Sequence, residues 1–288
     1  MNQSSLRRLV LGVALLASAL VARAQYATGV VSYTPGTGFA TEFGSGLPYN
    51  QTAAVLGEPS RVIPGEFGGP VDPFAPPYTR DQLLSVGAGG SLTVSFSTPI
   101  RNEAANPFGL DFQIYGGAGF IVTNDFDADF NFIGTPATDG SLFSAQTGAT
   151  RVSVSADGLT YFTLDPGLAP KVEGLYPVDG QGSFGLPVNP ALTGLSFAGK
   201  SLTEVRALYA GSGGGIGYDL TWARDGGGLG VTLPEISYVR IDVLSGKAEI
   251  DGLSAVTAVP EPATWAMFSA GLGVLLCAGG RRSKCQLR

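Results

Sequence analysis

The sequence over residues 83–256 is dominated by short segments in which apolar side chains recur at every second position. Residues 91–97 place Leu92, Val94 and Phe96 between serine and threonine, and residues 237–243 repeat the pattern with valine and isoleucine. This period of two is typical of strands that bury one face and expose the other. Because no window of similar length shows a capped helical period, the sequence predicts an all-β fold, a single β-sandwich of the jelly-roll type.

Turn residues separate these predicted strands. Further segments of the same kind are residues 30–33, 111–115, 151–156, 159–164 and 247–256. Asp157 and Gly158 form a two-residue hairpin signal, because such turns need positive φ. A run rich in glycine and proline covers residues 25–77 and is expected to wrap the fold rather than fill it. A turn or two of helix is expected only at residues 190–202.

The N-terminus has the order of a secretory signal peptide. Arg7 and Arg8 precede an apolar run at residues 9–21, and Ala22 and Ala24 are the two small residues that a signal peptidase reads. We expect cleavage after Ala24. Residues 1–24 are then removed, and residues 25–258 form one exported β-sandwich domain.

The last thirty residues, 259–288, differ in composition from the rest. They hold, in order, a Pro-Glu-Pro motif, an uncharged run and a basic end, which are Pro260, Glu261 and Pro262, residues 263–280, and Arg281 with Arg282. As a helix with a rise of about 1.5 Å per residue, the uncharged run spans roughly 27 Å, close to the hydrocarbon thickness of a bilayer. We therefore expect a transmembrane helix with its basic end in the cytoplasm and the preceding domain outside.

These three parts in this order resemble the PEP-CTERM sorting signal of bacterial envelope proteins. The resemblance implies an exosortase that cuts near the Pro-Glu-Pro and releases or re-anchors the protein, often in cells that make exopolysaccharide. The protein would then reside at the cell surface or in the extracellular matrix. The alternative is a plain C-terminal membrane anchor, since proline and glutamate are also favoured in the first turn of a helix.

Composition narrows the function classes. Residues 25–258 contain 10 basic and 22 acidic side chains, a net charge of −12, so nucleic acid is not an expected partner. The chain has no histidine, which removes Ser-His-Asp and Cys-His catalysis and histidine-ligated zinc. Both cysteines, Cys277 and Cys285, lie in the tail, so the exported domain has no disulfide.

A second resemblance concerns the exported domain. Residues 151–162 resemble the hairpin of galactose-binding-like and discoidin-like sandwiches, and residues 238–242 with 249–252 are similar to the last paired strands of those folds. Residues 87–100, 111–112 and 218–222 also look like bacterial surface proteins of unassigned role that end in PEP-CTERM tails. The resemblance implies a galactose-binding-like sandwich but not a ligand, because one sandwich hosts many functions.

An acidic run is a candidate metal site. Asp125, Asp127, Asp129 and Asn131 repeat at every second position, like the ligands in the first half of a calcium loop. Phe130 stands where such a loop needs glycine, and the later bidentate glutamate is missing. A structural calcium and a solvated acidic face therefore both stay open, and no other cofactor is indicated.

A glycine-rich run at residues 211–217 is a candidate mobile loop, and loops at the ends of a sandwich often bind ligands. The aromatic residues beside it, Tyr209, Tyr218 and Trp222, are suited to stack on sugar rings, and Asp219 to orient hydroxyl groups. The alternative is that these aromatics pack in the core.

The sequence thus favours a non-catalytic exported protein that acts in adhesion or exopolysaccharide association, as in a biofilm. Its expected partners are signal peptidase, an exosortase, the membrane before processing, and extracellular polysaccharide. One alternative is a secreted carbohydrate-active hydrolase, since two carboxylates at the right separation suffice for that chemistry. Another is a purely structural matrix protein.

Overall fold

The computed structural model describes residues 25–66, 68–125, 127–129, 132–144 and 148–257. The predicted signal peptide, with Ala22 and Ala24, lies outside these residues. So does the whole tail, with the Pro-Glu-Pro motif, the predicted transmembrane helix and the arginine pair. Among the helices in the described ranges, none combines the length and apolar character needed to span a bilayer.

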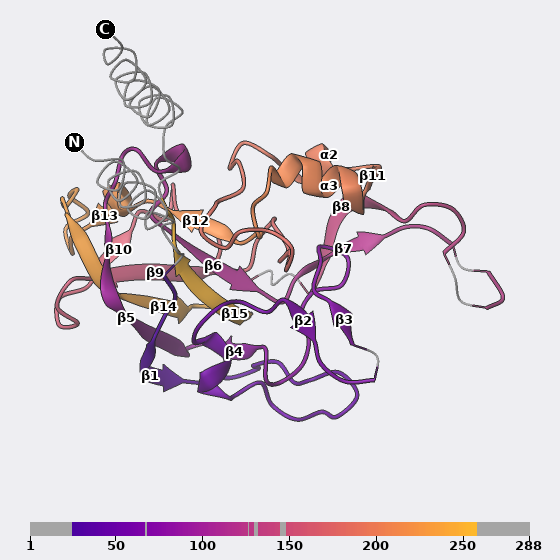
Figure 1. Cartoon of the computed structure of the whole chain (residues 1–288). Helices are drawn as coiled ribbons and strands as arrows, with labels where there is room; N and C mark the ends of the chain where they lie inside the picture. The colour runs from indigo at the N-terminus through magenta and orange to yellow at the C-terminus, as the bar shows by residue number, and fades with distance from the viewer. Residues whose placement is uncertain (1–24, 67, 126, 130–131, 145–147, 258–288) are drawn as a thin grey trace, which may run out of the picture. The chain divides into compact units, whose positions relative to one another are not determined.

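Two antiparallel sheets form the body of the fold (Figure 1). The larger sheet has the strand order β1-β5-β14-β9-β10-β13 and the smaller has the order β12-β6-β15-β4. The bounds in the larger sheet are β1 Gly29–Thr34, β5 Ser91–Arg101, β14 Glu235–Val243, β9 Thr150–Ser155, β10 Phe162–Leu164 and β13 Ala223–Arg224. Those in the smaller sheet are β12 Ile216–Tyr218, β6 Phe112–Gly116, β15 Lys247–Ala255 and β4 Leu84–Gly87.

Strand register places the predicted apolar positions side by side. Val239 of β14 lies opposite Val94 of β5 on one side and Val154 of β9 on the other. In the smaller sheet, Leu253 of β15 lies opposite Ile114 of β6. Each of these side chains is fully buried, so the alternation seen in the sequence corresponds to one inward face per sheet.

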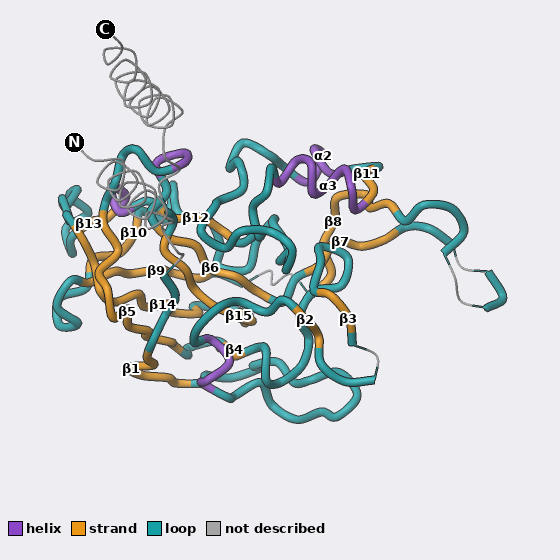
Figure 2. Tube along the Cα trace, in the orientation of Figure 1, coloured by secondary structure: helices purple, strands orange, loops and turns teal. Residues whose placement is uncertain are grey.

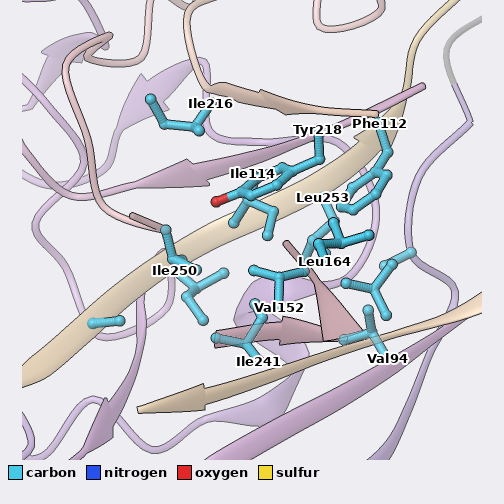
Figure 3. Close-up of a cluster of buried hydrophobic side chains, with 14 of the residues drawn as sticks. Val94, Phe112, Ile114, Val152, Leu164, Ile216, Tyr218, Ile241, Ile250 and Leu253 are labelled. Atoms are coloured by element: carbon cyan, nitrogen blue, oxygen red, sulfur yellow. The ribbon is translucent and has the colours of Figure 1, made fainter. Parts of the chain in front are cut away.

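The two inward faces meet in a single core (Figure 3). Val94, Val152 and Ile241 from the larger sheet face side chains of the smaller sheet, which are Phe112, Ile114, Ile250 and Leu253. Burial of each such side chain contributes about 1.5–3 kcal/mol. The main core draws on residues from Ala27 to Ala255, and the all-β sandwich predicted from the period of two is confirmed.

Smaller elements lie around the sandwich. A three-stranded sheet joins β11 Lys200–Ser201, β8 Ala137–Phe143 and β7 Gly119–Val122, and a short pair joins β2 Val62–Ile63 with β3 Gly69–Pro70. The helices α2 Gly194–Phe197 and α3 Leu202–Tyr209 contact β8 and β11, respectively (Figure 1). The remaining helical turns are η1 Thr52–Val55, η2 Pro107–Gly109 and η3 Leu220–Trp222. Long loops connect many of these elements (Figure 2).

Three local predictions need correction. The hairpin at Asp157 is longer than two residues, because Phe162 pairs with Val154 and the connection spans residues 156–161. The Asp157 carboxylate organises it by accepting hydrogen bonds from the Leu159 and Thr160 amides, each 2.8 Å long. In addition, β14 and β15 follow one another but lie in opposite sheets, so they are not paired with each other.

The third correction concerns helix α3, which lies beyond the predicted helical turn. Its N-terminus is a capping box in which Ser201 and Glu204 satisfy each other's backbone amides. Arg206 of the same helix makes two bonds to the buried Asp179 carboxylate, at 2.8 and 3.0 Å. Ser201 and Glu204 have the spacing of a capping box and are the sequence signal for this helix.

Candidate functional site

The glycine-rich segment is part of the packed interior and is not a mobile loop. Residues 212–216 are buried. A Cβ atom on Gly214 would lie 2.2 Å from the Pro177 carbonyl oxygen, and one on Gly215 would lie 2.6 Å from the Tyr115 ring. Both glycines also have φ near +80°, which disfavours other residues. The glycines therefore allow close approach of chain segments, and the prediction of a ligand-binding loop here is wrong.

The two tyrosines beside this segment are core residues. Tyr209 and Tyr218 are 1% and 0% exposed. The Tyr209 hydroxyl donates to the Pro177 carbonyl at 2.9 Å, and the Tyr218 ring stacks on Phe112 with centroids 5.1 Å apart. Burial raises the pKa of both phenols, so both stay neutral. Neither ring can stack on a sugar, and core packing, the alternative weighed above, is confirmed for both.

Asp219 and Trp222 do not complete a site either. The Asp219 carboxylate accepts the Thr221 amide at 2.7 Å and so caps η3. Trp222 is half-buried and packs against the main core. The predicted sugar site at Tyr209, Tyr218, Asp219 and Trp222 is therefore not assembled.

The acidic run lies in the connection between β7 and β8. Asp125, Asp127 and Asp129 are exposed, and an Asp127 oxygen accepts the Asp129 amide at 2.9 Å. Within the described ranges, no three acidic or cysteine side chains gather closely enough to hold a metal ion. Asn131 lies outside the described residues, so calcium binding at this run stays a prediction.

An open groove of about 1330 Å³ offers a different site. Its walls come from the 41–49 and 74–78 segments, and Leu83, Gly117, Phe143, Lys247 and Glu249 complete it. We call this site the large groove. A second cavity, beside Glu173, has a volume of about 10 Å³, which is room for one water molecule at most. Only the large groove, of these two, can admit an organic ligand.

Exposed aromatic rings line the large groove. Phe43, Tyr78 and Phe143 are 92%, 38% and 40% exposed. A tight turn presents Phe43, because the Glu42 amide donates to the Leu47 carbonyl at 2.8 Å and the Gly46 amide donates to that of Glu42 at 3.0 Å. The Tyr49 hydroxyl donates to the Tyr78 carbonyl and so joins the 41–49 wall to the 74–78 wall. Exposed rings held in this way can stack on an apolar ligand face.

A charged pair lies among these rings. Lys247 and Glu249 are two residues apart on β15, so they share one face of the strand, and their side chains are 3.4 Å apart. Behind them, the buried Glu173 carboxylate accepts the Glu249 amide at 3.1 Å. Burial, and then the charge of Glu249, hold the pKa of Glu173 well above its usual range, and burial also raises that of Glu249.

Sequence reasoning missed the large groove because its residues come from several segments that are distant in the sequence. Phe43 lies in a Gly-rich turn and Tyr78 follows two prolines, and neither position belongs to a periodic pattern. Glu249 is a charged residue that is itself buried inside a buried strand, which is the one local signal of a special role. Only the tertiary structure brings these side chains together.

Comparison with known proteins identifies the tail. Residues 258–283 match the PEP-CTERM protein-sorting motif, and this range contains the Pro-Glu-Pro and arginine pair, so the recognition of that motif is confirmed. The motif indicates an exported protein that is anchored in the membrane before exosortase processing. No curated protein sequence matches the chain.

One similar solved structure is a pectin-binding carbohydrate-binding module, with 10% identity over 62% of this chain and 75% of that chain. The TM-score of 0.24 is too low to support an argument about fold or ligand.

Proposed function

We propose that this protein is a non-catalytic surface or extracellular-matrix protein that associates with extracellular polysaccharide through the large groove. The observation that carries the proposal is the set of exposed rings, Phe43, Tyr78 and Phe143, around the Lys247–Glu249 pair. Sugar rings have an apolar face and polar edges, and proteins bind them with aromatic rings beside hydrogen-bonding groups. The sorting motif supports a location where such polymers occur.

The same proposal covers the processing of the chain and the type of its sandwich. Signal peptidase removes residues 1–24, the segment 263–280 crosses the membrane before processing, and the exported domain of residues 25–258 is a jelly-roll, galactose-binding-like sandwich. In the matrix, the protein acts in adhesion or exopolysaccharide association, as in a biofilm.

The neighbouring carboxyl groups of Glu173 and Glu249 are not placed as a glycosidase pair. A glycosidase needs two carboxyl groups that flank the scissile bond of the substrate. Both carboxyl groups are buried, Glu173 at 4% and Glu249 at 6% exposure, and Glu173 lies behind the backbone of Glu249, whose amide it accepts. Glu249 lines the large groove and Glu173 does not, so the two carboxyl groups do not flank a sugar bound there.

Affinity electrophoresis tests the proposal. The full chain, in a detergent without a sugar headgroup, is run through gels that contain dextran, xyloglucan, galactomannan or polygalacturonate, with and without calcium. We expect retardation by at least one polymer and no release of reducing sugar. Retardation by none would overturn the proposal, and sugar release that requires Glu249 would favour the hydrolase.

A matched pair of variants locates the binding. Phe43→Ala removes a ring that is 92% exposed, and we expect about 3- to 10-fold weaker retardation because one stacking contact is lost. Leu159→Ala removes an equally exposed side chain, 86% exposed, that does not line the large groove, and we expect no change. Equal effects of both variants would contradict the assignment.

A further inference from the structure

The side chains that line the large groove carry more negative than positive charge. Among the described residues that line it, Lys247 is the one cation, and it is paired with Glu249 at 3.4 Å. Glu42, on the opposite wall, accepts the Ser45 hydroxyl at 2.5 Å and the Arg80 amide at 2.9 Å. The large groove therefore offers no surplus positive charge to an anionic polymer.

The buried Glu173 adds a further carboxyl group close to the Lys247–Glu249 pair. Its carboxylate accepts the Glu249 amide, so it holds β15 in place and sets a second acidic group behind the first. Glu173 and Glu249 face one ammonium group, Lys247, so the cluster is neutral if the two acids share a proton and negative if they do not. A uronate carboxylate in the large groove would meet Glu249 and Glu42, and Lys247, the cation among the described residues that line the groove, is already paired.

Resting on the proposed function, we propose that the large groove selects uncharged polysaccharide and that Lys247 and Glu249 recognise neighbouring hydroxyl groups of a sugar ring. The Lys247 ammonium is purely a donor, and the Glu249 carboxyl group accepts. A hydroxyl group can donate to one and accept from the other, so two hydroxyls on adjacent carbons match the pair. The rings of Phe43 and Tyr78 then cover the apolar face of the same chain.

Two variants and a matched control test this inference in the same gels of the full chain. Glu249→Gln keeps the shape of the side chain but removes the carboxylate that is paired with Lys247, and Lys247→Met removes the donor. Lys200→Met is the control, because Lys200 is also paired with a glutamate, Glu204, at 3.2 Å and does not line the large groove. Thermal unfolding of each variant verifies that the fold is retained.

For the wild type we expect retardation by dextran or xyloglucan and none by polygalacturonate or alginate. Both groove variants should weaken retardation by the neutral polymer about 3- to 10-fold, the effect of one lost hydrogen bond, and the control should not. Glu249→Gln alone should gain retardation by polygalacturonate, and 300 mM salt should reverse that gain because it arises from Lys247.

The outcomes separate the two proposals. If the wild type binds polygalacturonate more tightly than neutral polymers, or if Phe43→Ala weakens binding while both groove variants leave it unchanged, this inference is overturned and the proposed function stands. If no polymer retards the wild type, the proposed function fails and this inference fails with it.

Discussion

Asp111 shows how much a single buried side chain does in this fold. It is 1% exposed, and its two oxygens accept hydrogen bonds from the Glu103 amide at 2.9 Å, the Asn106 side chain at 3.1 Å and the Leu220 amide at 2.9 Å. The side chain thus joins the start of β6 to the η2 and η3 connections. Burial raises the pKa of Asp111, and these three donors oppose that rise.

We predict that Asp111→Asn lowers the free energy of unfolding by about 1–3 kcal/mol, because an amide cannot accept all three bonds and leaves buried donors unpaired. Urea unfolding measures the change. Asp139→Asn is the control, since Asp139 is exposed and bonds only to Ser141, and it should change stability by less than about 0.5 kcal/mol. Equal losses in the two variants would contradict the role given to Asp111.

The sequence indicates the strand that follows Asp111 but not the role of the residue itself. The alternation of Phe112 and Ile114 is local, whereas Leu220, one of the three partners, is 109 residues away. The same holds for Tyr209 and Tyr218, whose sequence context suited either a sugar platform or the core. Only their burial decides between the two.

At the scale of elements, the strands were predictable and the connections were not. Four strands lie within a few residues of their predicted bounds, namely β5, β6, β9 and β14. Each strand buries one face, so its apolar residues recur at every second position of the sequence. The glycine-rich segment shows why connections are harder to predict, since glycine favours both loops and close packing. The spacing of Ser201 and Glu204 is a signal for α3, but the helix has only eight residues and shows little periodicity of its own.

The packing role of the glycine segment leads to a prediction. Gly214→Ala places a methyl group 2.2 Å from the Pro177 carbonyl oxygen at a φ of +82°, so we expect a loss of about 2–4 kcal/mol in the free energy of unfolding. Gly226→Ala is the matched control, because nothing lies within 4 Å of that position. Thermal unfolding compares the two, and a Gly214 variant as stable as the control would restore the mobile-loop interpretation.

For the whole molecule, buried carboxyl groups set how stability depends on pH. Burial raises the pKa of Asp251 from 3.8 to about 7, although Ser60 donates two hydrogen bonds to it. Burial also raises the pKa of Asp111, Glu173 and Glu249. The folded state therefore binds more protons than the unfolded state between about pH 4 and 7, and the stability that these groups contribute is lost as pH rises through that window.

Exposed carboxylates with a lowered pKa have the opposite effect on stability, which then falls as the pH decreases, but they act at lower pH. Hydrogen bonds from the Ser201 amide and hydroxyl lower the pKa of Glu204 to about 2, so its contribution is lost only on acidification below about pH 4.5. We therefore predict a higher melting temperature at pH 5 than at pH 8, and a smaller difference in Asp251→Asn. A melting temperature that rises steadily from pH 5 to pH 8 would contradict this assignment.

The central claim is that the large groove, and not the glycine-rich segment, is where the exported domain meets polysaccharide. Hydrogen–deuterium exchange of the full chain with and without xyloglucan or dextran tests it most directly. We predict that the polymer slows amide exchange in the 41–49 and 74–78 segments and leaves residues 209–222 unchanged. Protection confined to residues 209–222, with the groove segments unaffected, would contradict the account.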